Sequence, residues 1–452
     1  MTNGLDLADI QGNILRGYRM GDGRHFLLHL NDAAGARQFV AAVTPGSAAS
    51  DPNVTTAEEW NDKPAYTFNV GFSFSGMSTL GVPPAVLNAF PKAFRRGPLG
   101  PYGEPDGESG SASGPTADVI VSLYTDENRS PQLERLTKQL REMFTRFNLK
   151  ELQTQDARAL AHHRVHFGYR DGIAQPQISG APGRPVADLQ PEARPGDFLL
   201  GCGYTNAFGG NYIGQLPGTL GDNATYASFR IMVQDVRAFD DFLTRTADRT
   251  GMDRELVAAK LMGRWRNGTP LVLSPEAPDP QHPISPDAIN RFDYTPGPGH
   301  PAFYDDSEGL RCPLGAHSRR LNPRGALVVG KQHTHRLIRR GMPFGPPFHP
   351  DEPDDGHVRG LVGYFICGDF ETQFEFILHT WGNRDFATYG IRGTTDPFVG
   401  RQRPGGGKFT IRTAGTNDPV VLTDLPQLVE TSTEVYCFIP GIGGLRYLAS
   451  LT

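Results

Sequence analysis

Strand-like and helix-like segments follow one another along this chain in an order that restricts how it can fold. In the first part, apolar or alternating runs predict strands at residues 25–30, 65–75 and 117–124, and apolar spacings of three and four residues predict helices at residues 32–43, 83–94 and 132–147. With its long insertions, this order is compatible with an α+β sandwich of ferredoxin-like type.

A second cycle of the same kind follows near the middle of the chain, without a clear sequence repeat of the first. It comprises predicted strands at residues 224–233, 360–367 and around 434–439, and predicted helices at residues 236–247, 253–261 and 371–380. At 452 residues the chain is too long for one ordinary core. We therefore expect two α+β halves, residues 1–165 and 166–452.

The composition is that of a soluble globular protein, with 38% hydrophobic and 21% charged residues. A net charge of −5 gives no electrostatic footprint for nucleic acid, and no apolar run reaches the roughly 18 residues that cross a membrane. The N-terminus lacks a signal pattern, and the four cysteines form no CxxC pair. We expect a cytoplasmic protein with no nucleic-acid or membrane partner; no feature predicts its oligomeric state.

The stretch at residues 166–176 (HFGYRDGIAQP) is the first candidate for chemistry. Gly168 and Gly172 bracket Asp171, so the backbone turns sharply and the carboxylate points out of the turn. A carboxylate fixed in this way between basic neighbours can accept protons. The alternative is a turn aspartate whose oxygens satisfy its own backbone.

The second candidate is His317, in the segment at residues 312–324 (CPLGAHSRRLNPR). A neutral imidazole is the commonest protein ligand of haem iron, and its other nitrogen needs an acceptor to fix its orientation. The neighbouring arginines suit the anionic propionates of a haem. The alternative is a surface histidine among arginines.

The third candidate lies in residues 336–345 (RLIRRGMPFG), where Gly341 and Pro343 are expected to break the segment. An arginine just before the break can be held rigidly. Clustered arginines usually form a solvated face, but the apolar residues among them favour partial burial.

Taken together and in order, these segments resemble the dye-decolorizing peroxidase family of haem enzymes. The resemblance rests on five stretches, DIQGNILRGY at 9–18, GYRDG at 168–172 (the family's GxxDG motif), AHSRRLNPR at 316–324, RLIRRGMPFG at 336–345 and GLVGYFICGDFETQFEFILHTW at 360–381. They cover nearly the whole domain. One GxxDG is a weak signal, whereas the ordered set is specific.

The resemblance implies two ferredoxin-like modules in a dimeric α+β barrel-like arrangement, with haem b held mainly by the C-terminal module, residues 166–452. By the same resemblance, Asp171 matches the distal acid, His317 the proximal iron ligand and Arg339 the distal arginine, with Arg340 and Arg336 as the next candidates. The chain departs from some relatives in having Gly341 where they carry asparagine. Some relatives also carry a distal phenylalanine near the position of Gly363.

The implied function is that of a haem peroxidase, which reduces hydrogen peroxide and oxidises dyes, phenolics or other small-molecule organic reductants. Asp171 would move a proton between the two peroxide oxygens, and Arg339 would stabilise the charge on the departing hydroxide. The acceptor for the second nitrogen of His317 is not evident, with Glu375 as one candidate. Large dyes cannot enter a pocket sized for peroxide, so Trp60, Trp265, Trp381 and the tyrosines are possible electron relays or simply core residues.

Other functional classes fit parts of the sequence. Cys312 is a candidate thiolate ligand, but its RCPLGAH context lacks the expected glycine frame. The pairs His333/His335 and His162/His163 have no third ligand at metal spacing. A haem-handling protein, which stores haem or releases its iron, would need His317 but no rigid acid–arginine pair. A biosynthetic oxidase with one dedicated substrate would share all three residues.

Overall fold

The structure, a computed structural model, describes residues 5–46, 52–100, 116–126, 130–183, 188–205, 211–212, 216–278, 284–285, 288–295, 305–326, 333–386, 390–413, 415 and 418–452. Its centre is one eight-stranded sheet in the order β4-β1-β3-β2-β12-β7-β9-β8, in which all neighbouring strands are antiparallel. The strands are β1 (Asp22–Leu30), β2 (Tyr66–Phe72), β3 (Val119–Thr125), β4 (Leu149–Arg158), β7 (Thr225–Gln234), β8 (Ile338–Phe344), β9 (Gly360–Cys367) and β12 (Val429–Ile439).

Each half of the sheet has the same strand permutation. The first four strands lie in the order 4-1-3-2, and β7, β8, β9 and β12, taken as a second set, lie in that order too. This is the strand order of a ferredoxin-like module, so the predicted α+β class is confirmed. A single register pair, Phe438 with Phe72, joins the halves. The division between residues 165 and 166 stays a prediction; it falls between β4 and β7.

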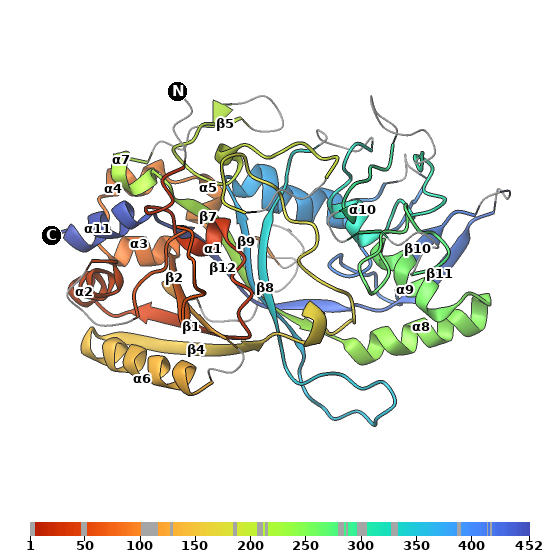
Figure 1. The fold of residues 1–452 in the computed structure, drawn as a ribbon, viewed down its shortest axis with the longest axis horizontal. Coiled ribbons are helices and arrows are strands. Elements are labelled where there is room, and N and C mark those ends of the chain that lie inside the picture. Colours follow the sequence, from red (N-terminus) through yellow and green to blue (C-terminus); the bar gives the residue numbers. More distant parts are fainter. Residues whose placement is uncertain are drawn as a thin grey trace.

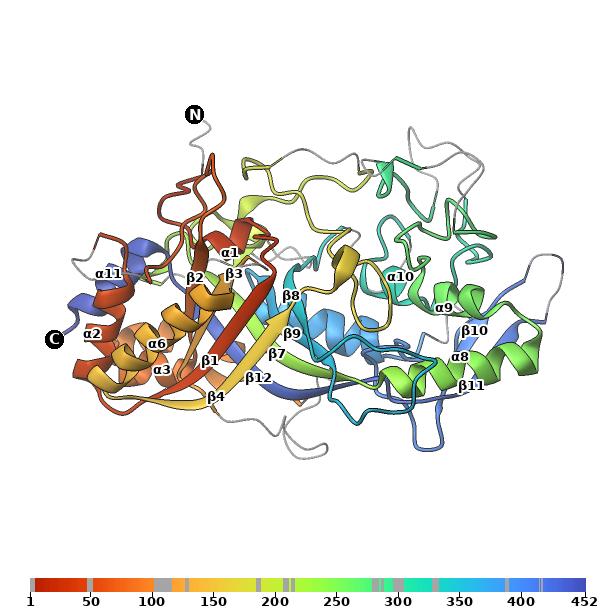
Figure 2. The same cartoon turned by 60° about the horizontal axis from the view of Figure 1, so that its bottom comes forward.

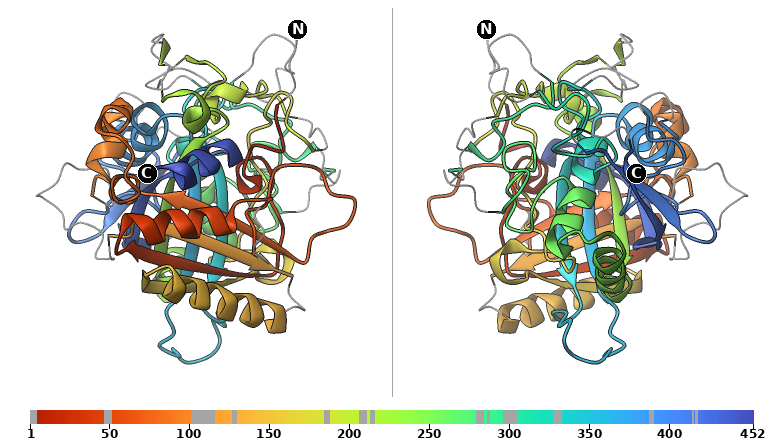
Figure 3. Two further views of the ribbon diagram at one scale, coloured as in Figure 1. Left: turned by 90° about the vertical axis from the view of Figure 1, so that its left-hand side faces the viewer. Right: turned by 90° about the vertical axis from the view of Figure 1, so that its right-hand side faces the viewer.

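The sheet curls without closing. Among the described residues no hydrogen bonds join its edge strands β4 and β8, so the arrangement resembles a barrel but is not a closed one. Its inner face is lined from both halves by apolar side chains, including Leu27 and Ile120 from the first and Ile338 and Ile366 from the second. The end-on views in Figure 3 show the strands surrounding this shared interior.

Helices cover the outer face of each half and bury their apolar sides against it. The first half carries α2 (Ala33–Val43), α3 (Phe74–Thr79), α4 (Pro84–Ala89), α5 (Lys92–Arg96), α6 (Ser130–Arg146) and α11 (Ile442–Ser450); the second carries α8 (Val236–Thr250), α9 (Arg254–Met262), α10 (His317–Leu321), η5 (Phe370–Phe374) and η6 (Ile377–Asn383). Figures 1 and 2 show α2, α6 and α11 at one end of the molecule and α8, α9 and α10 at the other.

Smaller elements complete the described chain: α1 (Gly12–Leu15), η1 (Ala161–His163), η2 (Pro195–Asp197), β5 (Tyr204–Thr205), β6 (Asn211–Tyr212), α7 (Gly218–Gly221), β10 (Gly407–Ile411) and β11 (Val420–Leu425). No helix in the described ranges is long and apolar enough to cross a bilayer. All four cysteines are free thiols.

Local chemistry explains both the agreements and the differences with the predicted elements. The helix expected at 32–43 is α2, and its N-cap is Asp32, whose carboxylate accepts a hydrogen bond of 2.7 Å from the Gly35 amide. The single helix expected at 83–94 is two, α4 and α5, because Pro91 cannot donate to a helical bond and Phe90 before it is extended. The helix expected at 371–380 is two π-type segments, η5 and η6.

The break expected at Gly341 and Pro343 was wrong. Both residues lie inside β8, in register with Gly363 and Leu361 of β9. Because β8 is an edge strand, the missing N–H of proline is tolerated there. The polar strand β4 on the opposite edge was not predicted, since its alternation is not apolar.

Candidate functional site

His317 and Asp396 form the most closely defined pair in the C-terminal half. His317 is the first residue of α10, and its Nδ1 lies 3.0 Å from each carboxylate oxygen of Asp396. Asp396 is fully buried and also accepts hydrogen bonds of 2.9 Å from the amides of Phe398 and Val399. The ring of Phe398 packs edge-on against the imidazole at 5.4 Å.

These contacts determine which nitrogen of His317 is available. Burial alone raises the pKa of Asp396, but the charge and hydrogen bond of His317 and the two backbone amides outweigh it, and the pKa is lowered. An ionised Asp396 holds the imidazole proton on Nδ1. The Nε2 atom then has a free lone pair, and no hydrogen-bond partner for it lies within the described part of the chain.

The acceptor for His317 is therefore Asp396, and the suggestion of Glu375 was wrong. Glu375 lies between η5 and η6, where its carboxylate accepts a hydrogen bond of 3.0 Å from the Tyr436 hydroxyl and pairs with Arg96. Sequence spacing gave no signal for Asp396, which follows His317 by 79 positions and belongs to a loop.

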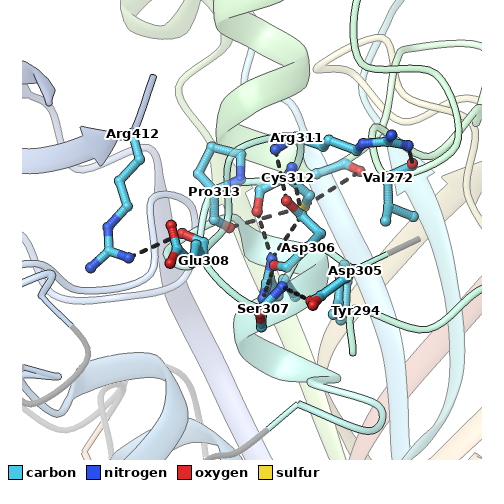
Figure 4. A network of polar contacts seen from close by, with 12 residues as sticks. Val272, Tyr294, Asp305, Asp306, Ser307, Glu308, Arg311, Cys312, Pro313 and Arg412 are labelled. Atoms are coloured by element: carbon cyan, nitrogen blue, oxygen red, sulfur yellow. Dashed lines mark hydrogen bonds and ion pairs between the residues drawn. The ribbon is translucent and has the colours of Figure 1, made fainter. Parts of the chain in front are cut away.

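A buried polar network holds the start of α10 (Figure 4). The Asp306 carboxylate accepts hydrogen bonds from the backbone amides of Arg311, at 2.8 Å, and Cys312, at 2.9 Å. It also pairs with the Arg319 guanidinium at 3.0 Å, and both side chains are almost fully buried. Arg319 in turn donates to the Cys312 carbonyl at 2.8 Å, so the segment that precedes His317 is fixed at both ends.

The arginines after His317 are structural, and the expectation that they face haem propionates was wrong. Arg319, Arg320 and Arg324 are each no more than 3% exposed. Arg320 donates to backbone carbonyls, including that of Trp381, and Arg324 pairs with Asp188 at 2.8 Å. Their cationic groups are used to fasten α10 to its surroundings.

The Asp171 turn has the sharp geometry that its glycines indicate. Gly168 and Gly172 have φ values of +86° and +72°, which L side chains rarely adopt. The Asp171 amide donates to the His163 carbonyl at 2.9 Å, while its side chain is exposed and finds no partner among the described residues. The carboxylate therefore does not cap its own turn, which argues against the alternative interpretation.

Arg339 is fastened to the segment that leaves this turn. Its Nη2 donates to the Ala174 carbonyl at 3.0 Å. The Gln175 side-chain amide makes two further bonds to the Arg339 backbone, accepting from N at 3.0 Å and donating to O at 3.1 Å. Strand, turn and guanidinium are thus held as one unit. Sequence reasoning did not assign Gln175 this role.

Strand geometry separates Arg339 from the neighbouring arginines. Arg340 points to the inner face of the sheet, where it donates to the carbonyls of Asn13 and Ile14. Arg336 donates to the Pro191 carbonyl at 2.7 Å. Of the three, Arg339 alone bonds the segment that carries Asp171.

Strand β9, which pairs with β8 opposite Arg339, explains why Gly363 stands near the position where some relatives carry a phenylalanine. A Cβ at Gly363 would stand 1.9 Å from the Arg340 carbonyl oxygen, so this position holds no side chain. Phe365, two residues later, is the register partner of Arg339 and lies on the same face. Phe365 therefore places an aromatic ring on the same face as the arginine.

Helix α9 supports both candidate groups. The buried Tyr169, inside the turn, donates its hydroxyl to the Ala258 carbonyl of α9 at 2.7 Å. Gly263, which ends α9 with φ +88°, packs so closely against α10 that a Cβ there would lie 2.3 Å from Ser318 Oγ. The Asp171 turn and the His317 helix are therefore positioned from the same element.

The remaining sequence candidates have other roles. Cys312 is fully buried, and burial raises the pKa of its thiol to about 12, so a thiolate ligand is not supported. His335 stacks on Phe376 at 3.9 Å. Within the described residues no group of three or more His, Cys, Asp or Glu side chains is arranged to hold a metal ion.

The donor set fits a haem. A neutral imidazole with a free Nε2, oriented through Nδ1 by a buried carboxylate, is a donor that would hold haem iron. A carboxylate without a partner among the described residues and a half-buried guanidinium, fixed to one another through residues 174 and 175, can serve as a proton acceptor and a cation.

The chain is similar in sequence to several curated peroxidases. No protein-family model matches the chain. It is 28% identical to a dye-decolorizing peroxidase of Exidia glandulosa over 472 residues (98% of this chain, 87% of that one) and 28% identical to a peroxidase of Mycetinis scorodonius over 416 residues (88% and 76%). A multifunctional dye peroxidase of an Amycolatopsis strain is 30% identical over 240 residues, half of this chain and 48% of the other.

Solved structures share the fold. The crystal structure of a dye-decolorizing peroxidase superposes with a TM-score of 0.81 at 22% identity, covering 99% of both chains. A dye-decolorizing peroxidase in complex with 2,6-dimethoxyphenol gives 0.80 at 23% identity, covering 99% of this chain and 100% of the other. A third, described by its engineered heme pocket, gives 0.78 at 22% identity with the same coverage.

Proposed function

This chain belongs to the dye-decolorizing peroxidase family of haem enzymes, and we propose that His317, Asp171 and Arg339 form the site at which it reduces hydrogen peroxide. When bound, haem b supplies the iron that takes up the two oxidising equivalents of peroxide and returns them to a reductant. Residues 166–452 would contribute most of the pocket, and residues 1–165 the second module.

On one side of the cofactor, His317 would bind the iron through Nε2. The ionised Asp396 holds the other nitrogen protonated, which fixes the ring orientation and raises the electron density that the imidazole offers. The edge of Phe398 restricts ring rotation.

On the other side, the exposed Asp171 carboxylate would accept the proton of hydrogen peroxide and return it to the leaving oxygen, which departs as water. The Arg339 guanidinium would stabilise negative charge on that oxygen during the cleavage. Loss of one preorganised donor of this kind typically costs about 10²–10³ in rate.

The observation that carries the proposal is the linkage of Asp171 and Arg339 through Ala174 and Gln175, with the Asp171 carboxylate unpartnered among the described residues. A haem-handling protein requires an iron ligand but no such acid–arginine unit. The comparisons favour the peroxidase over that alternative. A specialised oxidase with one biosynthetic substrate uses the same three residues and remains the second candidate.

The second substrate belongs to the small organic reductants. Phenolics and dyes are suggested by the complex of a relative with 2,6-dimethoxyphenol and by the names of the curated relatives. Four free cysteines support a reducing, cytoplasmic location, which fractionation of the source cells tests.

Stopped-flow absorption of the haem-loaded protein tests the proposal. One equivalent of peroxide should shift the Soret band rapidly, and 2,6-dimethoxyphenol should restore it. Asp171→Asn and Arg339→Leu should each slow the shift by about 10²-fold or more, whereas Arg336→Leu should leave it unchanged. Slow bleaching without a shift in the wild type would support haem handling, and wild-type rates in both variants would contradict the assigned roles.

A further inference from the structure

Asp171 stands at the base of a tight loop, residues 163–171, which we call the Asp171 loop. The loop is closed where the Asp171 amide donates a hydrogen bond of 2.9 Å to the His163 carbonyl. Arg164 and Arg170, the next residues inward, pair as an isolated antiparallel bridge. The position of the Asp171 carboxylate therefore depends on how the whole loop is held against the rest of the molecule.

The chain enters this loop through two strained residues. His162 and His163 have φ values of +59° and +54°, in the left-handed region that residues with a β-carbon seldom adopt. Such a conformation costs free energy and persists only where the surrounding structure holds it. Both imidazoles are exposed, so the contacts that hold the loop must come from its buried residues.

His166 fastens the buried side of the loop to β8. The residue is 6% exposed, and its Nε2 lies 2.7 Å from the carbonyl oxygen of Phe344, the last residue of β8. A carbonyl can only accept, so Nε2 carries the proton and Nδ1 does not. Nδ1 is buried without a hydrogen-bond partner among the described residues. An apolar side chain would avoid that unsatisfied atom, so packing alone does not account for the imidazole.

Two separate contacts thus fasten the segment of the acid to the strand that carries Arg339. Before Asp171 in the chain, His166 bonds the carbonyl at the end of β8. After Asp171, the Gln175 side-chain amide bonds the Arg339 backbone near the start of the same strand. A segment held at one point can pivot about it, whereas attachment on both sides restrains it along its length.

The surroundings of His166 favour its neutral form. Burial lowers the pKa of this imidazole, the hydrogen bond to the Phe344 carbonyl opposes burial, and the Arg359 cation lowers the pKa again. Arg359 is itself buried and pairs with the exposed Asp355 carboxylate at 2.8 Å. A second proton on His166 would have to go to Nδ1, which has no acceptor among the described residues.

The other charged groups at the loop are paired or exposed. Arg266 donates to the Phe167 carbonyl and pairs with Glu255 at 2.6 Å. The titratable and charged side chains of the loop that are exposed are His163, Arg164, Arg170 and Asp171. Arg359 is thus the cation that acts on His166 within the described part of the chain.

We propose that His166 is a positioning residue, whose neutral form fastens the Asp171 loop to β8 and so holds the Asp171 carboxylate in place relative to Arg339, and whose protonation releases the loop. This inference rests on the proposed peroxidase function. The pKa of His166 lies below its usual value near 6.5, so the loop is held at pH 7 and is released as pH falls through the lowered pKa. The site thereby has a pH response beyond protonation of the acid itself.

Stopped-flow measurement of the peroxide reaction in the haem-loaded protein tests the positioning. His166→Leu removes the donor and should lower the rate constant at pH 7 at least about tenfold, because a misplaced acid–base group slows proton transfer. His166→Gln keeps an N–H donor and should stay within about threefold of wild type. His25→Leu, at another buried histidine, is the matched control and should react at the wild-type rate.

The pH dependence of this rate constant separates positioning from a merely structural role. Protonation of Asp171 alone gives an acid limb whose slope, in the logarithm of the rate constant against pH, is at most one. In wild type the release of the loop adds a second proton, so the limb should be steeper than one. His166→Gln has no imidazole to titrate, so its slope should not exceed one.

Amide hydrogen exchange of the haem-loaded protein, read by mass spectrometry without peroxide, follows the loop directly. In His166→Leu, peptides that cover residues 163–171 should exchange at least about tenfold faster than in wild type. Peptides from β8 and α10 should keep their wild-type protection, and so should the loop in His166→Gln.

Wild-type peroxide kinetics together with wild-type exchange in His166→Leu would overturn the proposal, as would an acid limb in His166→Gln as steep as that of wild type. Loss of protection throughout the protein would show that His166→Leu unfolds, and the acid limb of His166→Gln then decides. Failure of the proposed function is distinguishable, because wild-type protein would then not react with peroxide. If this inference alone fails, wild type and both variants react alike.

Discussion

Asp396 holds His317 by placing both carboxylate oxygens 3.0 Å from its Nδ1, across 79 residues of sequence. The carboxylate is fully buried and is itself oriented by two backbone amides. Such a contact fixes the tautomer and direction of a ligand without touching the iron. The proximal side of the proposed site therefore depends on a loop near β10 as much as on α10.

Asp396→Asn should weaken haem binding. The amide cannot supply the negative charge that holds the Nδ1 proton, and replacing a group in this position typically costs 10–100-fold in affinity or activity, about 1.4–2.7 kcal/mol. Haem titration followed at the Soret band measures the change. Asp424→Asn, an exposed carboxylate, is the control and should retain wild-type affinity.

Gln175→Ala should slow the reaction with peroxide while leaving haem affinity near wild type. The substitution removes both hydrogen bonds from the side-chain amide to the Arg339 backbone, so the guanidinium and the Asp171 turn are no longer held in a fixed relative position. We expect about a tenfold or greater decrease in the peroxide rate constant and a loss of roughly 1–2 kcal/mol in unfolding free energy. Gln139→Ala, whose amide accepts only from exposed Arg135, should change neither quantity.

Asp306→Ala should destabilise the protein by about 3–5 kcal/mol, because it leaves the buried Arg319 charge without its partner. Urea unfolding measures the loss. The same variant frees the amides of Arg311 and Cys312 and should weaken haem binding through His317. The double variant Asp306→Ala/Arg319→Met removes both charges and should recover part of the stability; a double variant less stable than either single one would contradict this account.

His25→Gln should flatten the dependence of stability on pH below neutrality. Burial lowers the pKa of His25 to about 3 in the folded protein, opposed only by the distant charge of Asp156, while the unfolded pKa is about 6.5. Between these values the unfolded chain binds more protons, so the unfolding free energy falls as pH falls below about 6.5. At pH 5 the loss is about 2 kcal/mol.

Thermal unfolding of wild type and His25→Gln at pH 7 and pH 5 checks this expectation. The drop in Tm between the two conditions should be smaller in the variant. His29→Gln is the control, because His29 is exposed and pairs with Asp118. An equal drop in wild type and His25→Gln would show that His25 is not the titrating group.

Sequence patterns determined the elements whose burial is one-sided and whose ends are capped. In α8, Phe239, Phe242 and Leu243 are buried as their spacing predicts, and Asp235 caps the helix through the Ala238 amide at 2.8 Å. The ordered motifs also identified the family and the Asp171, His317 and Arg339 candidates. Patterns of this kind are readable from the sequence because they depend on residues that lie within a few positions of one another.

Only the tertiary structure decided which groups meet. Asp396 reaches His317 from a loop, and Gln175 reaches Arg339 across 164 positions, and neither contact has a local signature. The pairing of β8 with β9 places Arg339 and Arg340 on opposite faces of the sheet. Tertiary packing also buries the arginines that follow His317. A hydrogen bond depends on the positions of two groups in space, and sequence separation does not limit it.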